Sequence, residues 1–196
     1  MKVKSFIKQS HELIPIELEL GLLPGLPNLH FLGKADSLLK ESSLRIKSAI
    51  KKQGFQWPQA QQVIVDLKPS PLTKSSEGIE LAVICAYLWA TGQMEKPDSW
   101  GEIPFVYGQV DLEGRVFKPK DLELLGEWNA SEPLVTGQGE SQCDFSHLSL
   151  EQLKDLQAPE WIEGESDHSW QNKLQRPKFT RIKLNEKVAQ LLSLVA

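Results

Sequence analysis

Residues 25–78 decide the fold and read GLPNLHFLGKADSLLKESSLRIKSAIKKQGFQWPQAQQVIVDLKPSPLTKSSEG. After a Gly-Pro turn, a short strand is predicted at residues 28–33. Apolar and small residues then recur at helical spacing, which predicts an amphipathic helix capped at Asp36 or Ser37 and stopped at Gly54. The β-branched run at residues 62–68 predicts an interior strand.

The segments on either side of this stretch add a hairpin and a buried helix. Residues 2–8 and 13–20 alternate between apolar and polar, which predicts two paired strands with one solvent-exposed face. Pro15 indicates an edge or strand-start position. Residues 78–91 are apolar nearly all round and predict a central buried helix, with Ser75 or Ser76 as N-cap and Gly92 at its end.

The second half of the chain carries weaker patterns. A hairpin is predicted from residues 104–110 and 115–117 around the turn 111–114, followed by a short helix at 120–125. Residues 129–184 predict an irregular connection that encloses a strand at 133–136 and a brief helix at 150–156, with weak order signals from 159 onward. Together these elements predict the α+β class, a mixed sheet with helices packed on one side.

Composition places the chain among ordinary globular proteins. It has 196 residues, 40% hydrophobic, with a net charge of −4. The two cysteines, Cys85 and Cys143, make neither a disulfide framework nor a zinc site. There is no signal-peptide pattern and no apolar run of membrane-span length, so we expect a cytoplasmic protein with no membrane partner.

Bases are concentrated in the first predicted helix. Such a segment fits either a solvated helix face or contact with an anionic partner such as DNA. The candidate nucleic-acid-binding residues are Lys40, Arg45, Lys47, Lys51 and Lys52. Arg45 is also placed to pair with Glu41 one helical turn away, and that pair is the role we expect for it.

A series of short motifs follows one another between Lys2 and about Trp128. They are Gly25-Leu26-Pro27, Gly33, Lys40-Glu41-Ser42 with Arg45, Gly54-Phe55 with Pro58, Val65-Asp66-Leu67, Lys74, Gly78-Ile79-Glu80-Leu81-Ala82, Thr91-Gly92-Gln93 and Gly108-Gln109-Val110-Asp111-Leu112-Glu113-Gly114. In their order and spacing the chain resembles the N-terminal domain of the ComM/YifB family of AAA+ ATPases, often labelled magnesium chelatase, ChlI-like subunit. The resemblance implies a ribosomal S5 domain 2-like fold, shared with the Lon protease domain.

The resemblance also implies a domain organisation. It places a ChlI-like N-terminal domain at residues 1–128, an irregular linker at 129–184, and at 185–196 the start of an AAA+ module, because that segment resembles the helix before the strand that carries the phosphate loop. No G-x-x-x-x-G-K-[ST] motif occurs in the 196 residues. We therefore expect ATP and Mg²⁺ to be cofactors of a full-length protein rather than of this piece.

By the same resemblance, Ser76 falls at or beside the nucleophile position of Lon-type proteases. The dyad lysine of that chemistry would align near Glu123, although Lys118 and Lys120 are close in sequence. A carboxylate cannot replace that lysine, so Ser76 is expected to be a vestigial position, with helix capping as its structural role. The four histidines lack metal-ligand spacing, and no metal site is predicted.

Three functions follow as expectations. The first is a non-catalytic accessory domain of a ComM-like hexameric ATPase that acts on DNA in branch migration, recombination and natural transformation, with its own C-terminal ATPase module as a partner. The alternatives are a Lon-type serine protease domain, disfavoured without its lysine, and a Mg-chelatase-type ATPase subunit.

Overall fold

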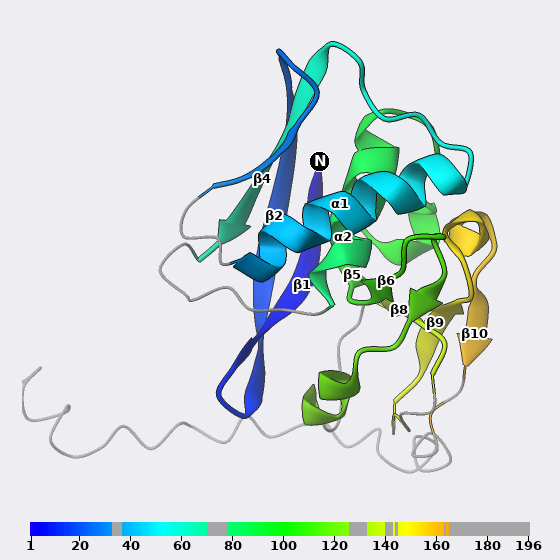
Figure 1. The fold of residues 1–196 in the computed structure, drawn as a ribbon. Helices are drawn as coiled ribbons and strands as arrows, with labels where there is room; N and C mark the ends of the chain where they lie inside the picture. The colour runs from blue at the N-terminus through cyan, green and yellow to red at the C-terminus, as the bar shows by residue number, and fades with distance from the viewer. Residues whose placement is uncertain are drawn as a thin grey trace, which may run out of the picture.

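The computed structural model describes residues 1–32, 37–69, 78–125, 133–139, 143, 145–162 and 164, with the backbone alone described for residues 37–40 (Figure 1). In this part of the chain the elements are, in order, β1 (Lys2–Gln9), β2 (Glu12–Pro24), β3 (Leu29–Phe31), α1 (Ser37–Lys52), β4 (Gln61–Lys68), α2 (Ile79–Ala90), η1 (Asp98–Trp100), β5 (Phe105–Val106), β6 (Gln109–Val110), β7 (Val116–Phe117), η2 (Lys120–Leu125), β8 (Leu134–Gly137), β9 (His147–Leu150), η3 (Leu153–Gln157) and β10 (Glu160–Ile162), where η marks a 3-10 helix.

The described strands form one mixed sheet and one small hairpin. The sheet has eight strands in the order β10-β9-β8-β5-β1-β2-β4-β3, while β6 pairs only with β7. β2 runs antiparallel to both β1 and β4, whereas β3 and β4 are parallel and are joined through α1. This arrangement confirms the α+β class predicted from the sequence.

Both long helices lie on one side of the sheet. α2 contacts β1 and β2, and α1 packs against α2 (Figure 1). Eleven consecutive residues of α2, from Ile79 to Trp89, are buried, which confirms the central helix predicted from its apolar run. None of the helices in the described part of the chain has the length and hydrophobicity that a membrane span requires.

The opposite face of the sheet is covered at one end. Phe6 is fully buried there in a second core cluster with Leu13, Tyr107, Leu122, Leu134 and Phe145. The short helix η2, which contributes Leu122, contacts β2. The predicted solvent-exposed face of β1 is therefore wrong at Phe6, because a segment more than a hundred residues later in the chain covers it.

Pro15 sits where its missing N–H is tolerated. β4 pairs with β2 only from Glu17 to Pro24. Before Glu17, β2 therefore has β1 on one side and no described strand on the other. The edge position predicted for Pro15 is thus correct locally, although β2 as a whole is an interior strand.

The segment that follows residue 128 contributes three strands to the same sheet. β8 pairs with β5, β9 with β8, and β10 with β9. The brief helix predicted at residues 150–156 is η3 and begins later, at Leu153, because the side chains of Gln152 and Asp155 form a capping box there. Leu150 is instead the last residue of β9, and Glu160–Ile162 form a strand where weak order was predicted.

The start of α2 also differs from its prediction. Its N-cap is Gly78, without a side-chain cap, so Ser75 or Ser76 does not occupy that position. Gly78 packs directly on the ring of Tyr107, and its carbonyl accepts a hydrogen bond of 2.8 Å from the N–H of Gly108. The Tyr107 hydroxyl lies 3.0 Å from both carboxylate oxygens of Asp121, so the ring is held in place. Ser75 and Ser76 themselves lie outside the described residues.

His147 is a buried titratable group on the same covered face. Its side chain is 2% exposed, and Nδ1 lies 3.1 Å from the carbonyl oxygen of Phe145. Burial lowers the pKa of His147; the hydrogen bond to Phe145 opposes this shift, and the nearby charge of Lys118 adds to it. The imidazole is therefore kept neutral in the folded protein.

We predict that Gly78→Ala destabilises the fold by about 1–3 kcal/mol, because an added Cβ would lie 2.4 Å from ring atoms of the fixed Tyr107. Urea denaturation measures the effect. Gly21→Ala is the matched control, since a Cβ on Gly21 meets nothing within 4 Å. Equal losses in the two variants would contradict the close packing at Gly78.

We predict that the protein loses stability as pH falls from 7.5 to 5.5. The unfolded state binds a proton at His147 near the ordinary pKa of about 6.5, whereas the buried ring in the folded state has a lower pKa. The free energy of unfolding therefore falls by at most about 1.4 kcal/mol per pH unit from this one group. His147→Asn should flatten this loss, and His30→Asn, which replaces an exposed histidine, is the matched control. Identical pH profiles for wild type and His147→Asn would refute the assignment.

Candidate nucleic-acid interface on helix α1

Helix α1 is positioned by its apolar stripe and by its C-terminal cap. Ile46, Ala49 and Ile50 are fully buried against α2 and the sheet, which confirms the predicted stripe at these positions. The helix ends at Lys52, and Gly54, two residues later, adopts the left-handed conformation (φ 84°). The N–H of Phe55 bonds to the carbonyl of Ile50 at 3.0 Å, and that of Gly54 to Lys51 at 3.1 Å, which is a Schellman motif.

Arg45 is committed to a buried carboxylate. Its Nε and terminal nitrogen lie 2.8 and 2.7 Å from Oε1 of Glu80, whose side chain is only 3% exposed. The other carboxylate oxygen of Glu80 accepts a hydrogen bond of 3.0 Å from the N–H of Val110. The expected pairing of Arg45 with Glu41 is therefore wrong: a buried carboxylate needs a cation far more than the solvated Glu41 does.

Lys47 lies on the flank of α1 that faces β3. Its Nζ donates to Oδ1 of Asn28 at 3.1 Å and lies 5.5 Å above the ring of Trp57. The same Oδ1 accepts the N–H of Leu29 at 2.9 Å. Because an amide and an aromatic ring carry no net charge, the positive charge of Lys47 is oriented but not neutralised.

The opposite flank of α1 meets the turn between β6 and β7. Ser48 Oγ donates to the carbonyl of Leu112 at 2.9 Å, and Gln53 Nε2 donates to that of Glu113 at 2.7 Å. The Nζ of Lys52 lies 3.4 Å from the Glu113 carboxylate. This flank therefore carries a counter-charge. Lys51, the residue before Lys52, is exposed and has no ion-pair partner among the described residues.

The turn itself is rigidified by Asp111. Its Oδ1 accepts the backbone N–H groups of Glu113 and Arg115, each at 2.9 Å, and Oδ2 pairs with the Arg115 guanidinium at 2.7 Å. Burial acts to raise the pKa of Asp111, but the hydrogen bonds from Arg115 and Glu113 outweigh it and lower the pKa. The carboxylate thus stays ionised and fixes the turn, as its position in a predicted turn suggests.

The five predicted bases therefore differ in what they can do. The structure places Lys47, Lys51 and Lys52 on the C-terminal half of α1, with Lys52 on the opposite flank from the other two. Arg45 is paired with Glu80, and the Lys40 side chain lies outside the described part. Lys47 and Lys51 are one helical turn apart, with Cβ atoms about 5–6 Å from each other. Sequence reasoning missed Glu80 and Glu113, although a single acid inside an otherwise apolar helix is a signal that it must be paired.

Another family-like motif, Thr91-Gly92-Gln93, holds the far end of α2. Gln93 Nε2 donates to the carbonyl of Gln56 at 2.9 Å, and its Oε1 accepts the Gln56 N–H at 2.6 Å. Tyr87 donates to the same carbonyl at 2.6 Å and stacks on Trp57 at 5.0 Å. These side chains tie the segment after α1 to the end of α2 and are used structurally.

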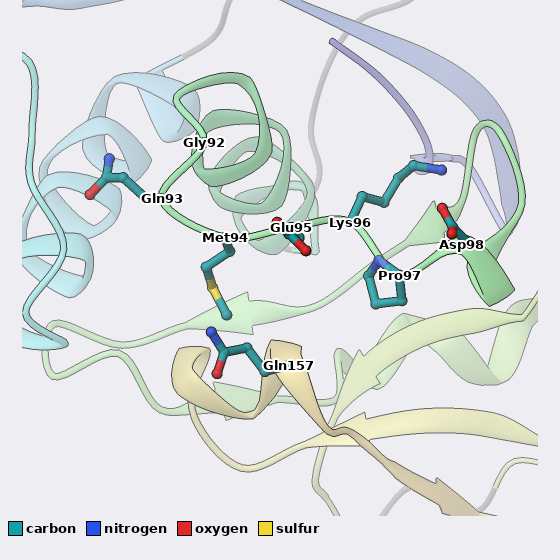
Figure 2. Close-up of a pocket in the computed structure, with 8 residues that line it drawn as sticks. All are labelled: Gly92, Gln93, Met94, Glu95, Lys96, Pro97, Asp98 and Gln157. Carbon is teal, nitrogen blue, oxygen red and sulfur yellow. The ribbon is translucent and has the colours of Figure 1, made fainter.

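An open polar pocket of about 600 Å³ adjoins this end of α2. It is lined by Gly92, Gln93, Met94, Glu95, Lys96, Pro97, Asp98 and Gln157. Figure 2 shows Met94 pointing toward Gln157, while the Gln93 side chain points away from it. The Nζ of Lys96 donates to the carbonyl of Gly101. Within the described ranges there is no group of three or more His, Cys, Asp or Glu side chains that could hold a metal ion.

The Lon-like dyad cannot be assembled from the described residues. Ser76 lies outside them, so its distance to any lysine is undefined. Glu123, at the aligned lysine position, is exposed on η2, as is Lys120. The vestigial role of Ser76 therefore stays a prediction.

We predict that Arg45→Met lowers the free energy of unfolding by about 2–3 kcal/mol, because Glu80 then remains buried without a cation; the value is below the range for fully buried pairs since the Arg45 side chain is 41% exposed. Lys52→Met is the control and should cost less than about 0.5 kcal/mol, because both members of its pair are exposed. Chemical denaturation measures both. Similar losses would show that the Glu80 pair is no stronger than a surface contact.

Comparison with known proteins agrees with the motifs. The family model described as subunit ChlI of Mg-chelatase matches residues 18–124, more than half of the chain. The uncharacterized protein Rv2897c of Mycobacterium tuberculosis H37Rv is 34% identical over 101 residues, which cover 52% of this chain and 20% of the relative. YifB of Escherichia coli K12 is 32% identical over 80 residues, 41% of this chain and 16% of the relative.

The chain thus matches only about a fifth or less of the length of these curated relatives. The matched residues include α1, α2 and the β6–β7 turn, the elements joined by Arg45, Glu80 and Glu113. We conclude that the chain belongs to the ChlI-like family, in agreement with the resemblance to the ComM/YifB family that its motifs predicted.

Proposed function

We propose that this chain is the non-catalytic N-terminal accessory domain of a ComM-like AAA+ ATPase that acts on DNA, in branch migration during recombination and natural transformation. The family match over residues 18–124 carries this proposal. ATP and Mg²⁺ would be bound by parts of the protein that this chain does not include, and the working form would be a homo-hexamer built around its ATPase module.

The roles of the motif residues support an accessory role. Among the motif residues that the structure describes, Arg45 and Glu80 join α1 to α2, and Gln93 joins α2 to the segment after α1. Because these polar side chains are engaged in contacts within the fold, we infer a binding or scaffolding role for the domain rather than a catalytic one.

The uncompensated bases of α1 support contact with DNA. Lys47 and Lys51 lie on one flank of α1, with no carboxylate partner among the described residues. Lysines arranged in this way neutralise phosphates without reading sequence, which suits a protein that follows branched DNA of any sequence.

The description of the matched family model favours a second candidate, a Mg-chelatase-type ATPase subunit. In that case DNA would not be the partner, and α1 would serve contacts between protein subunits. DNA binding by the chain separates the two candidates.

We predict that the chain binds branched DNA at 50 mM salt and releases it by 200 mM, and that Lys47→Gln combined with Lys51→Gln weakens binding about tenfold. Two lost phosphate contacts would also reduce the slope of log K against log salt by about two. Fluorescence anisotropy with a labelled four-way junction measures both quantities.

The matched control replaces Lys8 and Lys154 with Gln, since both are exposed, lie on other elements and remove the same charge. Its affinity should stay within about twofold of wild type. Equal weakening in the two double variants would mean that only net charge matters. Absence of binding at 50 mM salt would favour the chelatase-type function.

A further inference from the structure

The two flanks of α1 differ in how their charges are compensated. On the flank facing the β6–β7 turn, Arg45 is paired with Glu80 and Lys52 lies 3.4 Å from Glu113. On the flank facing β3, Lys47 contacts the neutral groups of Asn28 and Trp57. Of the basic side chains described on this helix, those with carboxylate partners therefore all belong to one flank.

The position of Glu113 does not depend on its contact with Lys52. Its main chain is fixed by Gln53, which donates to its carbonyl at 2.7 Å, and by Asp111, which accepts its N–H at 2.9 Å. Gly114, in the left-handed conformation (φ 85°), packs against the Gln53 side chain and completes the turn. The hairpin thus delivers a carboxylate to the end of α1 even when Lys52 is drawn elsewhere.

We infer that Glu113 is a built-in counter-charge that closes the hairpin flank of α1 to anions and confines an anionic backbone to the flank of Lys47 and Lys51. The inference deepens the proposed function and rests on it, since DNA is the polyanion expected there. Lys52 lies at the same end of α1, but its positive charge is compensated by Glu113 and is not available to the anion.

The Lys52–Glu113 pair is weaker than the Arg45–Glu80 pair, so Glu113 can change the affinity for an anion without unfolding the domain. Glu80 is buried, and removing its partner would threaten the fold. Glu113 and Lys52 have side chains 61% and 58% exposed, so their contact is weak and solvent-accessible. A weak pair of this kind changes an equilibrium by about two- to fivefold, which would adjust binding without abolishing it.

The test compares Glu113→Gln with wild type on the labelled four-way junction across a salt series. Glu113→Gln should bind about two- to fivefold more tightly, with the slope of log K against log salt steeper by about one because Lys52 gains a phosphate. Adding Lys52→Gln to Glu113→Gln should remove both gains. Lys52→Gln alone should not tighten binding, because it leaves the Glu113 carboxylate without its cation.

Glu95→Gln is the matched control, because it removes one exposed carboxylate from the loop after α2. Equal tightening in Glu95→Gln and Glu113→Gln would overturn the inference and leave DNA binding intact. Tighter binding by Lys52→Gln alone would overturn it as well. Binding by Glu113→Gln but not by wild type would contradict DNA binding by the native chain, and with it the confinement of the backbone to the flank of Lys47 and Lys51. Absence of binding by every variant would overturn both.

Discussion

The ion pair between Arg45 and Glu80 is the contact on which the arrangement of α1, α2 and the β6–β7 hairpin depends. Glu80 is a carboxylate placed in a helix that is otherwise buried and apolar. Its two oxygens are used separately, one by the guanidinium on α1 and the other by the backbone N–H of Val110 at the start of the hairpin. A single side chain therefore fixes three elements that come from residues 37–52, 79–90 and 109–117.

Other polar contacts repeat this pattern at each end of α2. At its start, the carbonyl of Gly78 and the N–H of Leu81 both bond to Gly108. At its end, Gln93 pairs through both amide atoms with the backbone of Gln56. Since α2 is apolar all round, hydrophobic burial alone would not define its rotation or its position along the sheet. The polar contacts at its two ends supply that definition.

Much of the fold is predictable because its signals are local. The apolar run of α2 and the glycines at 54 and 92 mark helices whose stops are visible in a few neighbouring residues. The burial of Phe6 is not predictable in this way, because Tyr107, Leu122 and Phe145, which share its cluster, lie more than a hundred residues later in the chain. β9 and β10 are difficult to predict from the sequence for another reason. Each is three or four residues long, and His147 and Ser149 put polar side chains on a face that turns out to be buried.

The candidate site likewise has features that are local in sequence and features that depend on distant residues. A basic helix with Lys47, Lys51 and Lys52 on its surface can be recognised from spacing alone. Which of those charges are already compensated depends on Glu80 and Glu113, which lie 35 and 61 positions beyond Arg45 and Lys52 and reach α1 only through the tertiary fold. Spacing within one helix predicts Glu41 as the partner of Arg45, because it considers only residues one turn away. The actual partner, Glu80, is buried and lies on another helix.

The small contacts of Asn28 bear on the behaviour of the protein in a crowded solution. β3 is an outer strand of the sheet, and such a strand offers unpaired N–H and C=O groups to any other extended chain. Asn28 occupies the N–H of Leu29 with its own side chain and brings the ammonium of Lys47 beside it. The other outer strand, β10, is only three residues long. In the described part of the chain both outer strands are only three residues long, which limits strand addition and so disfavours edge-to-edge aggregation at high local concentration.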